Sequence, residues 1–148
     1  MKVKRRATTS LRAEMEVEGR FMDVVIDTGA SVNMITDKLM EELGLEISKP
    51  SRNSFVIRDG KVVPSLGKVM LRMSDNNRLL DMEIKADVIE SSDKELILGN
   101  EWLKRFEAVI SYGNRCIMLR ENNDEIIIPV KYETYVNGDE KEEMIYTF

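Results

Sequence analysis

The sequence predicts an all-β domain, a closed barrel or sandwich with one or two short helices and one lobe in the chain. Short segments rich in β-branched and apolar residues recur with turn signals about every ten residues, which is typical of all-β architectures. The length of 148 residues is that of a single domain that buries one core.

The first pair of elements is a hairpin that leads to an acidic residue. Apolar and charged residues alternate from Leu11 to Val17, as in a half-buried strand, and Gly19 turns the chain. Residues 21–26 form the apolar return strand. Asp27 follows at once, in the small-residue turn Thr28-Gly29-Ala30-Ser31. A carboxylate is rarely placed at the end of a buried strand without a task, so we interpret Asp27 as a catalytic candidate rather than as a capping residue.

The next elements are a short strand and a short helix. The strand is expected over residues 32–35 and the helix over residues 38–43. Thr36 is the expected N-cap of this helix, and Gly44 its natural C-cap. The apolar face of the helix indicates a role in packing alone.

A projecting β-hairpin is expected in the middle of the chain. Residues 54–58 and 61–64 are β-rich runs separated by Asp59-Gly60, and this dipeptide favours the type I′ turn that needs positive φ at both central positions. Pro64 lacks a backbone donor and therefore favours an edge strand. Without the other motifs, an ordinary surface hairpin is the simpler interpretation.

The remaining elements complete the sheets and carry one glycine of interest. Further strands are expected over residues 69–73, 79–89, 95–98, 108–110, 115–120 and 126–128. Gly99 ends the strand pattern, and one or two turns of helix follow, up to Phe106. Two more β-rich runs flank Asn137-Gly138, where a further hairpin and a disordered tail fit equally well.

Composition excludes several kinds of chemistry and of partner. The chain has no histidine, which excludes Ser-His and Cys-His dyads and HExxH zinc sites, so we expect neither a metal nor another cofactor. Cys116, the single cysteine, has no intrachain partner and fits a reducing, cytoplasmic location. The net charge is −5. No apolar run reaches membrane-spanning length, so no membrane partner is expected.

We expect three segments along the chain: a flexible basic arm over residues 1–10, a domain over residues 11–130 and a C-terminal extension over residues 131–148. The arm lacks periodicity and interleaved aromatic residues. A solvated terminus is therefore a better interpretation of the arm than a nucleic-acid site.

Two motifs together carry a family resemblance. The run Val25-Ile26-Asp27-Thr28-Gly29-Ala30-Ser31 is followed later in the chain by Ile97-Leu98-Gly99-Asn100-Glu101-Trp102-Leu103. In this order, with a hairpin between them, they resemble the retropepsins, the aspartic proteases of retroviruses and LTR retrotransposons. The resemblance covers roughly residues 11–128 and implies a retropepsin-like barrel with one lobe per chain. Glu101 departs from the Asp or Asn usual at its position.

The resemblance implies an aspartic endopeptidase that processes a retroelement polyprotein. Peptide hydrolysis by water, with no metal and no histidine, needs one carboxylate as base and one carboxylic acid that polarises the scissile carbonyl. The chain has a single motif, so the resemblance implies a homodimer in which Asp27 faces its symmetry mate and the pair shares one proton. The alternative is a catalytically silent retropepsin-like domain for dimerisation or peptide binding. The intact Asp27-Thr28-Gly29 motif favours the enzyme.

The resemblance also implies roles for the surrounding residues. Thr28 would bond across the dimer axis, and Gly29 would leave backbone exposed to an extended polypeptide substrate. Further substrate contacts are implied for Ala30, Ser31, the hairpin residues Val56, Ile57, Arg58, Asp59 and Gly60, and the pocket residues Ile97 and Leu98. Gly99 would let the following helix pack under the catalytic loop. Ala30 lacks the hydroxyl of two-lobed relatives, which implies a mildly acidic pH optimum. The segment 131–148 matches no part of the family and is a candidate for dimer-interface strands.

Overall fold

The structure of the chain is a computed structural model. This structure describes the backbone of residues 4–56, 60–137 and 143–147, and the side chains of residues 10–56 and 60–133. The elements are β1 (Lys4–Val17), β2 (Arg20–Ile26), β3 (Met34–Thr36), α1 (Asp37–Glu42), β4 (Ser54–Val56), β5 (Val62–Pro64), β6 (Lys68–Ser74), β7 (Asp81–Ile89), β8 (Leu96–Leu98), α2 (Asn100–Arg105), β9 (Val109–Ser111), β10 (Cys116–Glu121), β11 (Asp124–Pro129), β12 (Lys131–Asn137) and β13 (Glu143–Thr147).

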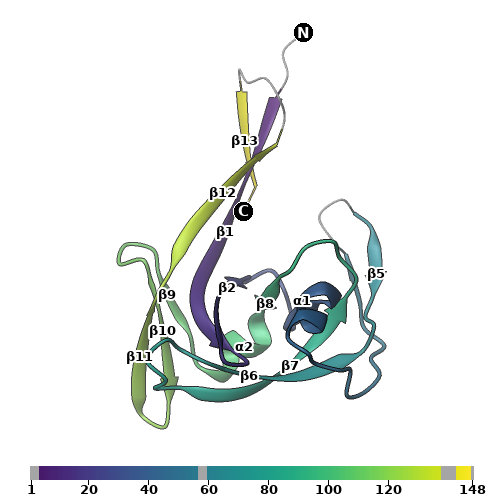
Figure 1. The fold of residues 1–148 in the computed structure, drawn as a ribbon. Coiled ribbons are helices and arrows are strands. Elements are labelled where there is room, and N and C mark those ends of the chain that lie inside the picture. Colours follow the sequence, from purple (N-terminus) through teal and green to yellow (C-terminus); the bar gives the residue numbers. More distant parts are fainter. Residues whose placement is uncertain (1–3, 57–59, 138–142, 148) are drawn as a thin grey trace.

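Six strands form a closed barrel (Figure 1). Their order is β1-β2-β8-β3-β7-β6, and β6 returns to β1 through the pairs Glu16↔Ser74 and Val17↔Met73. The β2–β8 and β3–β7 pairs are parallel, whereas the other pairs around the barrel are antiparallel. The predicted all-β class, with a closed barrel and two short helices, is confirmed.

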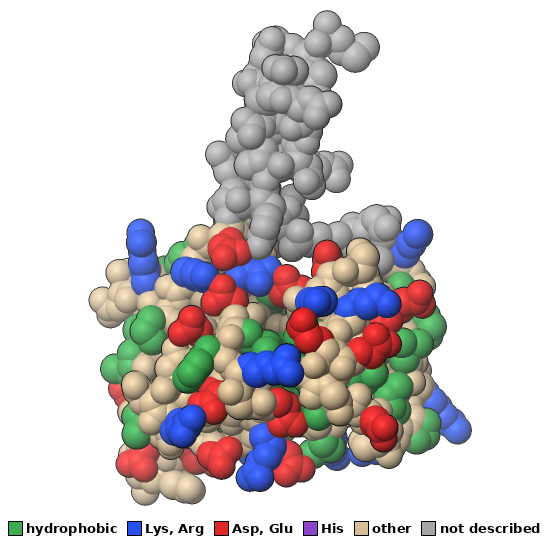
Figure 2. Space-filling model, in the orientation of Figure 1, with side chains coloured by type: hydrophobic (Ala, Val, Ile, Leu, Met, Phe, Trp, Pro, Cys, Tyr) green, Lys and Arg blue, Asp and Glu red, His purple; other side chains and the backbone are tan. Residues whose placement is uncertain are grey.

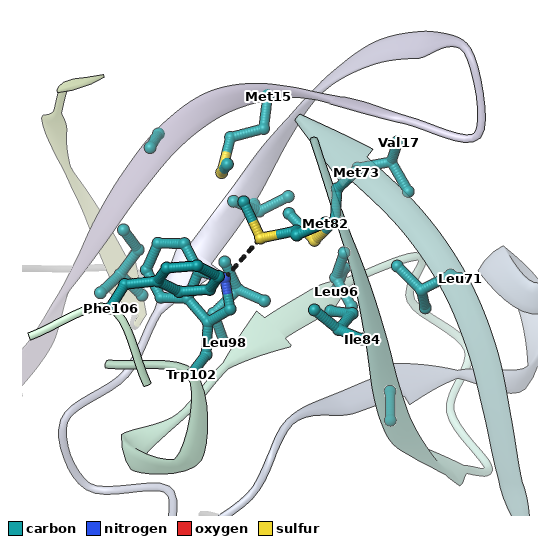
Figure 3. Packing of buried hydrophobic residues seen from close by; sticks show 14 of the residues in the cluster. Met15, Val17, Leu71, Met73, Met82, Ile84, Leu96, Leu98, Trp102 and Phe106 are labelled. Atoms are coloured by element: carbon teal, nitrogen blue, oxygen red, sulfur yellow. Dashed lines mark hydrogen bonds between the residues drawn. The ribbon is translucent and has the colours of Figure 1, made fainter. Parts of the chain in front are cut away.

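One hydrophobic core fills the barrel and extends to α2 and to strands β10 and β11 (Figure 3). Strand β7 alternates between buried and exposed positions from Asp81 to Ala86, as expected for a strand with one face on the core. Trp102 of α2 closes the core, and its indole Nε1 donates a hydrogen bond to Met82 Sδ at 3.0 Å. Its ring lies 5.6 Å from that of Phe106. Helix α2 is therefore fixed to the barrel by its own aromatic residues.

Local signals located most of the elements. The β1–β2 hairpin turns at Gly19, whose φ of 81° lies in the left-handed region that favours glycine. Thr36 caps α1 by accepting a hydrogen bond from the Leu39 amide at 3.4 Å. Gly44 follows the helix with a φ of 72°. These predictions are confirmed.

Two small sheets lie outside the barrel. Strands β4 and β5 form a separate antiparallel hairpin, with Ser54↔Pro64, Phe55↔Val63 and Val56↔Val62 as cross-strand pairs. This confirms the predicted hairpin and the edge position of Pro64. The expected turn residues Ile57, Arg58 and Asp59 lie outside the described residues. Strands β9, β10 and β11 form an antiparallel three-stranded sheet.

The first strand is longer than the alternation predicted. It begins at Lys4 rather than at Leu11, because its N-terminal half pairs with strands from the other end of the chain. Strand β12 pairs with it antiparallel and β13 pairs with it parallel. The two C-terminal runs are thus both strands, and each pairs with β1, so they form neither the further hairpin nor the disordered tail that the sequence left open. Figure 1 shows this part of β1, with β12 and β13, extending away from the barrel.

Ion pairs join β12 to the barrel where the extension begins. The guanidinium of Arg12, a buried residue, lies 3.0 Å from Glu95 and 3.2 Å from Glu133. Lys131 Nζ lies 2.6 Å from Asp23.

On the face shown in Figure 2, acidic and basic side chains are interspersed over the described surface. None of the helices in the described part of the chain has the length and apolar character needed to cross a membrane.

Candidate active site

A cleft of about 410 Å³ separates the turn after β2 from the β4–β5 hairpin. It is lined by Asp27, Gly29, Ala30, Ser31, Val32, Met34, Asn53, Ser54, Phe55 and Val56. The catalytic candidate Asp27 therefore shares one cleft with the strand that leads into the hairpin. The turn that carries Asp27 and the first strand of the hairpin, separated in sequence, thus face each other across this cleft.

Asp27 is held at the end of β2 by backbone hydrogen bonds. Its amide donates to the Leu98 carbonyl at 2.9 Å, which continues the β2–β8 pairing by one residue. The Gly29 amide donates to Asp27 Oδ1 at 2.8 Å, and the Ala30 amide donates to the Asp27 carbonyl at 3.2 Å. The half-buried carboxylate is thus oriented by its own turn and opens on the cleft.

The start of α2 holds the turn from beneath. The Asn100 amide donates to the Ala30 carbonyl at 2.7 Å, and the Glu101 amide donates to the Ser31 carbonyl at 3.1 Å. The Asn100 side chain donates to the Thr28 carbonyl at 3.0 Å. Backbone groups at the N-terminus of a helix have no partner within the helix, and here two of its amides bind the turn. The Asp-Thr-Gly turn is therefore rigidly supported.

Gly99 makes this close approach feasible. A Cβ atom at this position would lie 2.4 Å from the Val32 carbonyl oxygen and 2.6 Å from that of Ala30. The Gly99 amide donates to Asn33 Oδ1 at 3.1 Å, and the Asn33 side chain also donates to the Lys85 carbonyl. The expectation that Gly99 lets the helix pack under the catalytic loop is confirmed.

The structure brings together part of the predicted site. Thr28, Gly29 and Ser31 are exposed beside Asp27, while Ala30 is buried apart from the surface that it gives to the cleft. Val56 lines the cleft from the hairpin. Gly60 is exposed and does not line it, and Ile57, Arg58 and Asp59 lie outside the described residues.

The pocket residues of the second motif are placed differently from the expectation. Leu98 is fully buried in the core, where Figure 3 shows it among the other apolar side chains. Ile97 is half-buried, and neither residue is among those that line the cleft. The expectation for Leu98 is thereby corrected, because its strand alternates and this position faces inward.

Several polar residues near the site were missed at the level of sequence. Asn33, Asn53 and Asn100 support the catalytic turn or the hairpin through side-chain hydrogen bonds to residues distant in the chain, which leave no pattern in the sequence. Asp87 gave a signal that went unused, since it is an acidic residue within the apolar run Ala86 to Ile89. Among the described residues, no group of three or more His, Cys, Asp or Glu side chains is arranged to hold a metal ion.

The barrel, the supported Asp-Thr-Gly turn and the hairpin over one cleft define a retropepsin-like aspartic protease domain. Residues 13–105, more than half of the chain, match the family model described as "gag-polyprotein putative aspartyl protease". The chain belongs to this family. No curated protein sequence matches it at a significant level.

Solved structures share the fold. The retroviral protease-like domain of Ddi1 from Leishmania major is 19% identical, with a TM-score of 0.64 over 82% of this chain and 94% of that domain. EIAV protease in complex with the inhibitor HBY-793 is 17% identical, with a TM-score of 0.51 over 64% of this chain and 85% of that one. These similarities confirm the retropepsin-like fold.

Proposed function

We propose that the protein is an aspartic endopeptidase that works as a homodimer. The observation that carries the proposal is the position of Asp27, a carboxylate held in a supported turn on a cleft faced by a β-hairpin. Hydrolysis of a peptide bond by water, with neither a metal nor a histidine, needs two carboxyl groups in different protonation states, and the chain has no histidine. Each chain supplies one of them, so the site is completed by the Asp27 of a second copy.

The exposed edge of the turn supports this arrangement. Thr28 and Gly29 are exposed, although the turn is fixed from beneath by α2. A C2 interface joins the same patch of both subunits, so two such edges would meet on the axis and place the two carboxyl groups side by side. One carboxyl group then takes a proton from water while the other polarises the scissile carbonyl, and their roles exchange between turnovers.

The substrate is an extended polypeptide bound between the turn and the hairpin. The β4–β5 hairpin presents Val56 and Val62, a cross-strand pair that is 73% and 67% exposed. An extended peptide bonds to backbone groups and places alternate side chains in apolar pockets. We propose a retroelement polyprotein as the natural substrate, by extension from the family description.

The test compares the wild-type chain with Asp27→Asn. Both are incubated with denatured polypeptides over a series of pH values, with and without a statine-type inhibitor. We expect the wild type to cleave most strongly at mildly acidic pH and to be blocked by the inhibitor. We expect no cleavage by Asp27→Asn. Cleavage that persists in Asp27→Asn would refute the mechanism. A folded wild-type dimer that cleaves nothing would instead indicate the catalytically silent peptide-binding domain.

A further inference from the structure

The carboxylate of Asp87 lies beneath both ends of the β4–β5 hairpin. Asp87 belongs to β7 and is only 4% exposed. On β7 it falls between Ala86 and Val88, which face the core, so its side chain is buried on the outer face of the barrel. The segments that bury it are those that enter and leave the hairpin.

Three side chains from these segments donate hydrogen bonds to Asp87. Ser51 Oγ donates to Oδ1 at 2.6 Å, and Asn53 Nδ2 donates to Oδ2 at 3.1 Å; both residues precede β4. Ser65 Oγ, which directly follows β5, donates to Oδ1 at 2.9 Å. The two ends are also joined to each other, because the Ser65 amide donates to the Asn53 carbonyl at 2.8 Å.

The backbone of Asp87 connects the same residue to the catalytic turn. Its amide donates to the Asn33 carbonyl at 2.9 Å, within the parallel β3–β7 pairing. The Asn33 side chain also accepts a hydrogen bond from the Gly99 amide, beneath the turn that carries Asp27. One buried carboxylate thus links the base of the hairpin to the support of the catalytic residue.

We infer that Asp87 is a positioning residue that fixes the base of the β4–β5 hairpin relative to Asp27. A buried carboxylate is costly unless its oxygens are hydrogen-bonded, and here the donors come from the two ends of one hairpin. Any movement of the hairpin base away from β7 breaks these bonds together. The hairpin therefore moves from a fixed base, and its strands rather than its ends adjust to a bound peptide.

The inference rests on the proposed function for its effect on substrate, but its physical content is tested without catalysis. Amide hydrogen exchange in β4 and β5 is measured on the full chain for the wild type, Asp87→Asn, Asn53→Asp and the double variant. Each single variant sets two like groups against each other, two amides in one case and two carboxylates in the other. Exchange in β4 and β5 is expected to rise about tenfold, as for the loss of one hydrogen bond to a charged group.

The double variant provides the decisive comparison. It exchanges the amide and the carboxylate, keeps the net charge and leaves an oxygen at position 87 to accept from both serines. Exchange in β4 and β5 should return to within about threefold of the wild-type rate, which is under one kcal/mol by the relation between rate ratio and free energy. If the two single variants and the double variant all show the same amide exchange rates in β4 and β5, the inference is overturned.

A second buried aspartate serves as the matched control. Asp75 is 3% exposed and accepts hydrogen bonds from the Leu80 and Asn77 amides in the β6–β7 turn, at the opposite end of the β6–β7 pair from Asp87. Asp75→Asn should lower global stability and leave the relative exchange of β4 and β5 unchanged. If Asp87→Asn accelerates exchange in β6 and β10 as much as in β4 and β5, the residue acts only on global stability and the inference fails.

Catalysis supplies the second readout. With an active enzyme, Asp87→Asn should raise KM for a peptide about tenfold and change kcat by less than about threefold, because the reacting groups are untouched. The double variant should recover the wild-type KM, and a KM that stays raised there would contradict the inference. If the wild-type protein cleaves no peptide, the proposed function fails, while the exchange rates still decide the role of Asp87.

Discussion

At the scale of the residue, contact distances at Gly99 decide whether the catalytic turn can exist. The start of α2 comes so near the turn that a single carbon atom would meet two carbonyl oxygens at 2.6 Å or less. Backbone atoms cannot move aside as the end of a flexible side chain can. The helix amides at Asn100 and Glu101 bind the turn only because position 99 has no side chain.

Gly99→Ala should therefore both destabilise the fold and disturb the site. Inserting a carbon atom into a closely packed position costs about 1–3 kcal/mol, and the upper part of this range is expected here because the neighbours are backbone. Urea unfolding measures the loss. Gly113→Ala is the control, since a Cβ atom there meets no atom within 4 Å. Equal unfolding free energies for the two variants would contradict this account.

The residues of the site differ in how well sequence reveals them. Asp27 lies in a turn of small residues after an apolar strand, and Gly99 lies between a strand and a helix. These local patterns were enough to predict the roles of both residues. Asn33 and Asp87 act through hydrogen bonds to residues distant in the chain. These partners depend on the closed barrel, and no local pattern specifies which residues they are. Leu98 was misplaced for the same reason, since the face that it shows depends on how β8 inserts between β2 and β3.

At the scale of the element, the β4–β5 hairpin is a module with little core of its own. It forms a separate two-stranded sheet, and its valines 56 and 62 remain largely exposed. Isolated hairpins are marginally stable, so its order depends on its base. Exposed apolar side chains on such a module indicate a surface that becomes covered when peptide binds.

Val56→Ser and Val62→Ser should weaken peptide binding and leave stability almost unchanged. Replacing an exposed apolar residue changes the unfolding free energy by about 0.5 kcal/mol or less, whereas each lost contact with substrate raises KM. Steady-state kinetics and urea unfolding measure the two effects. Val109→Ser is the control, because Val109 is 53% exposed and belongs to β9, in a different sheet from the hairpin. A KM that rises as much in the control would contradict the role of the hairpin.

The C-terminal strand β12 is a second element with its own chemistry. Burial of its hydroxyl raises the pKa of Tyr132, with a further contribution from Tyr112, whose ring stacks on it at 5.7 Å. A hydrogen bond to Asp23 raises the pKa of Lys131. In both groups the folded state holds its proton more tightly than the unfolded chain does. Their contribution to stability is complete below about pH 10 and is lost as the pH rises through the folded pKa values.

Strand β12 should consequently loosen in alkaline solution. An ultraviolet absorbance titration should show a tyrosine that ionises above the ordinary range, and Tyr132→Phe should remove this late phase. The unfolding free energy of the wild type should fall more steeply above about pH 10 than that of Tyr132→Phe. Identical slopes for the two proteins would show that burial of Tyr132 contributes nothing to the docking of β12.

Local elements were predictable where the signal lies within a few residues. The Gly19 hairpin, the Thr36 cap and the β4–β5 hairpin each follow from short-range turn or capping chemistry. The partners of β1 were not predictable in the same way. The strand pairs with β2 by a local turn, but with β12 and β13 across the whole length of the chain, so the sequence alone left the C-terminal runs unplaced.

At the scale of the whole molecule, the barrel holds the catalytic turn open on one side. The barrel closes where β6 pairs with β1. Helix α2 and the parallel β2–β8 pair fix Asp27 at the edge of this barrel. One chain holds one Asp-Thr-Gly turn. If catalysis needs two carboxyl groups, the complete enzyme is a property of two molecules.

The most direct test of this claim is a mixing experiment. Wild-type chain is mixed with Asp27→Asn at constant total concentration and left to exchange subunits, after the variant has been shown to be folded and dimeric. With one carboxyl group from each chain, only wild-type pairs are active, so an equal mixture should keep about a quarter of the wild-type activity. Retention of about half, in proportion to the wild-type chain present, would show that each chain acts alone and would contradict the account.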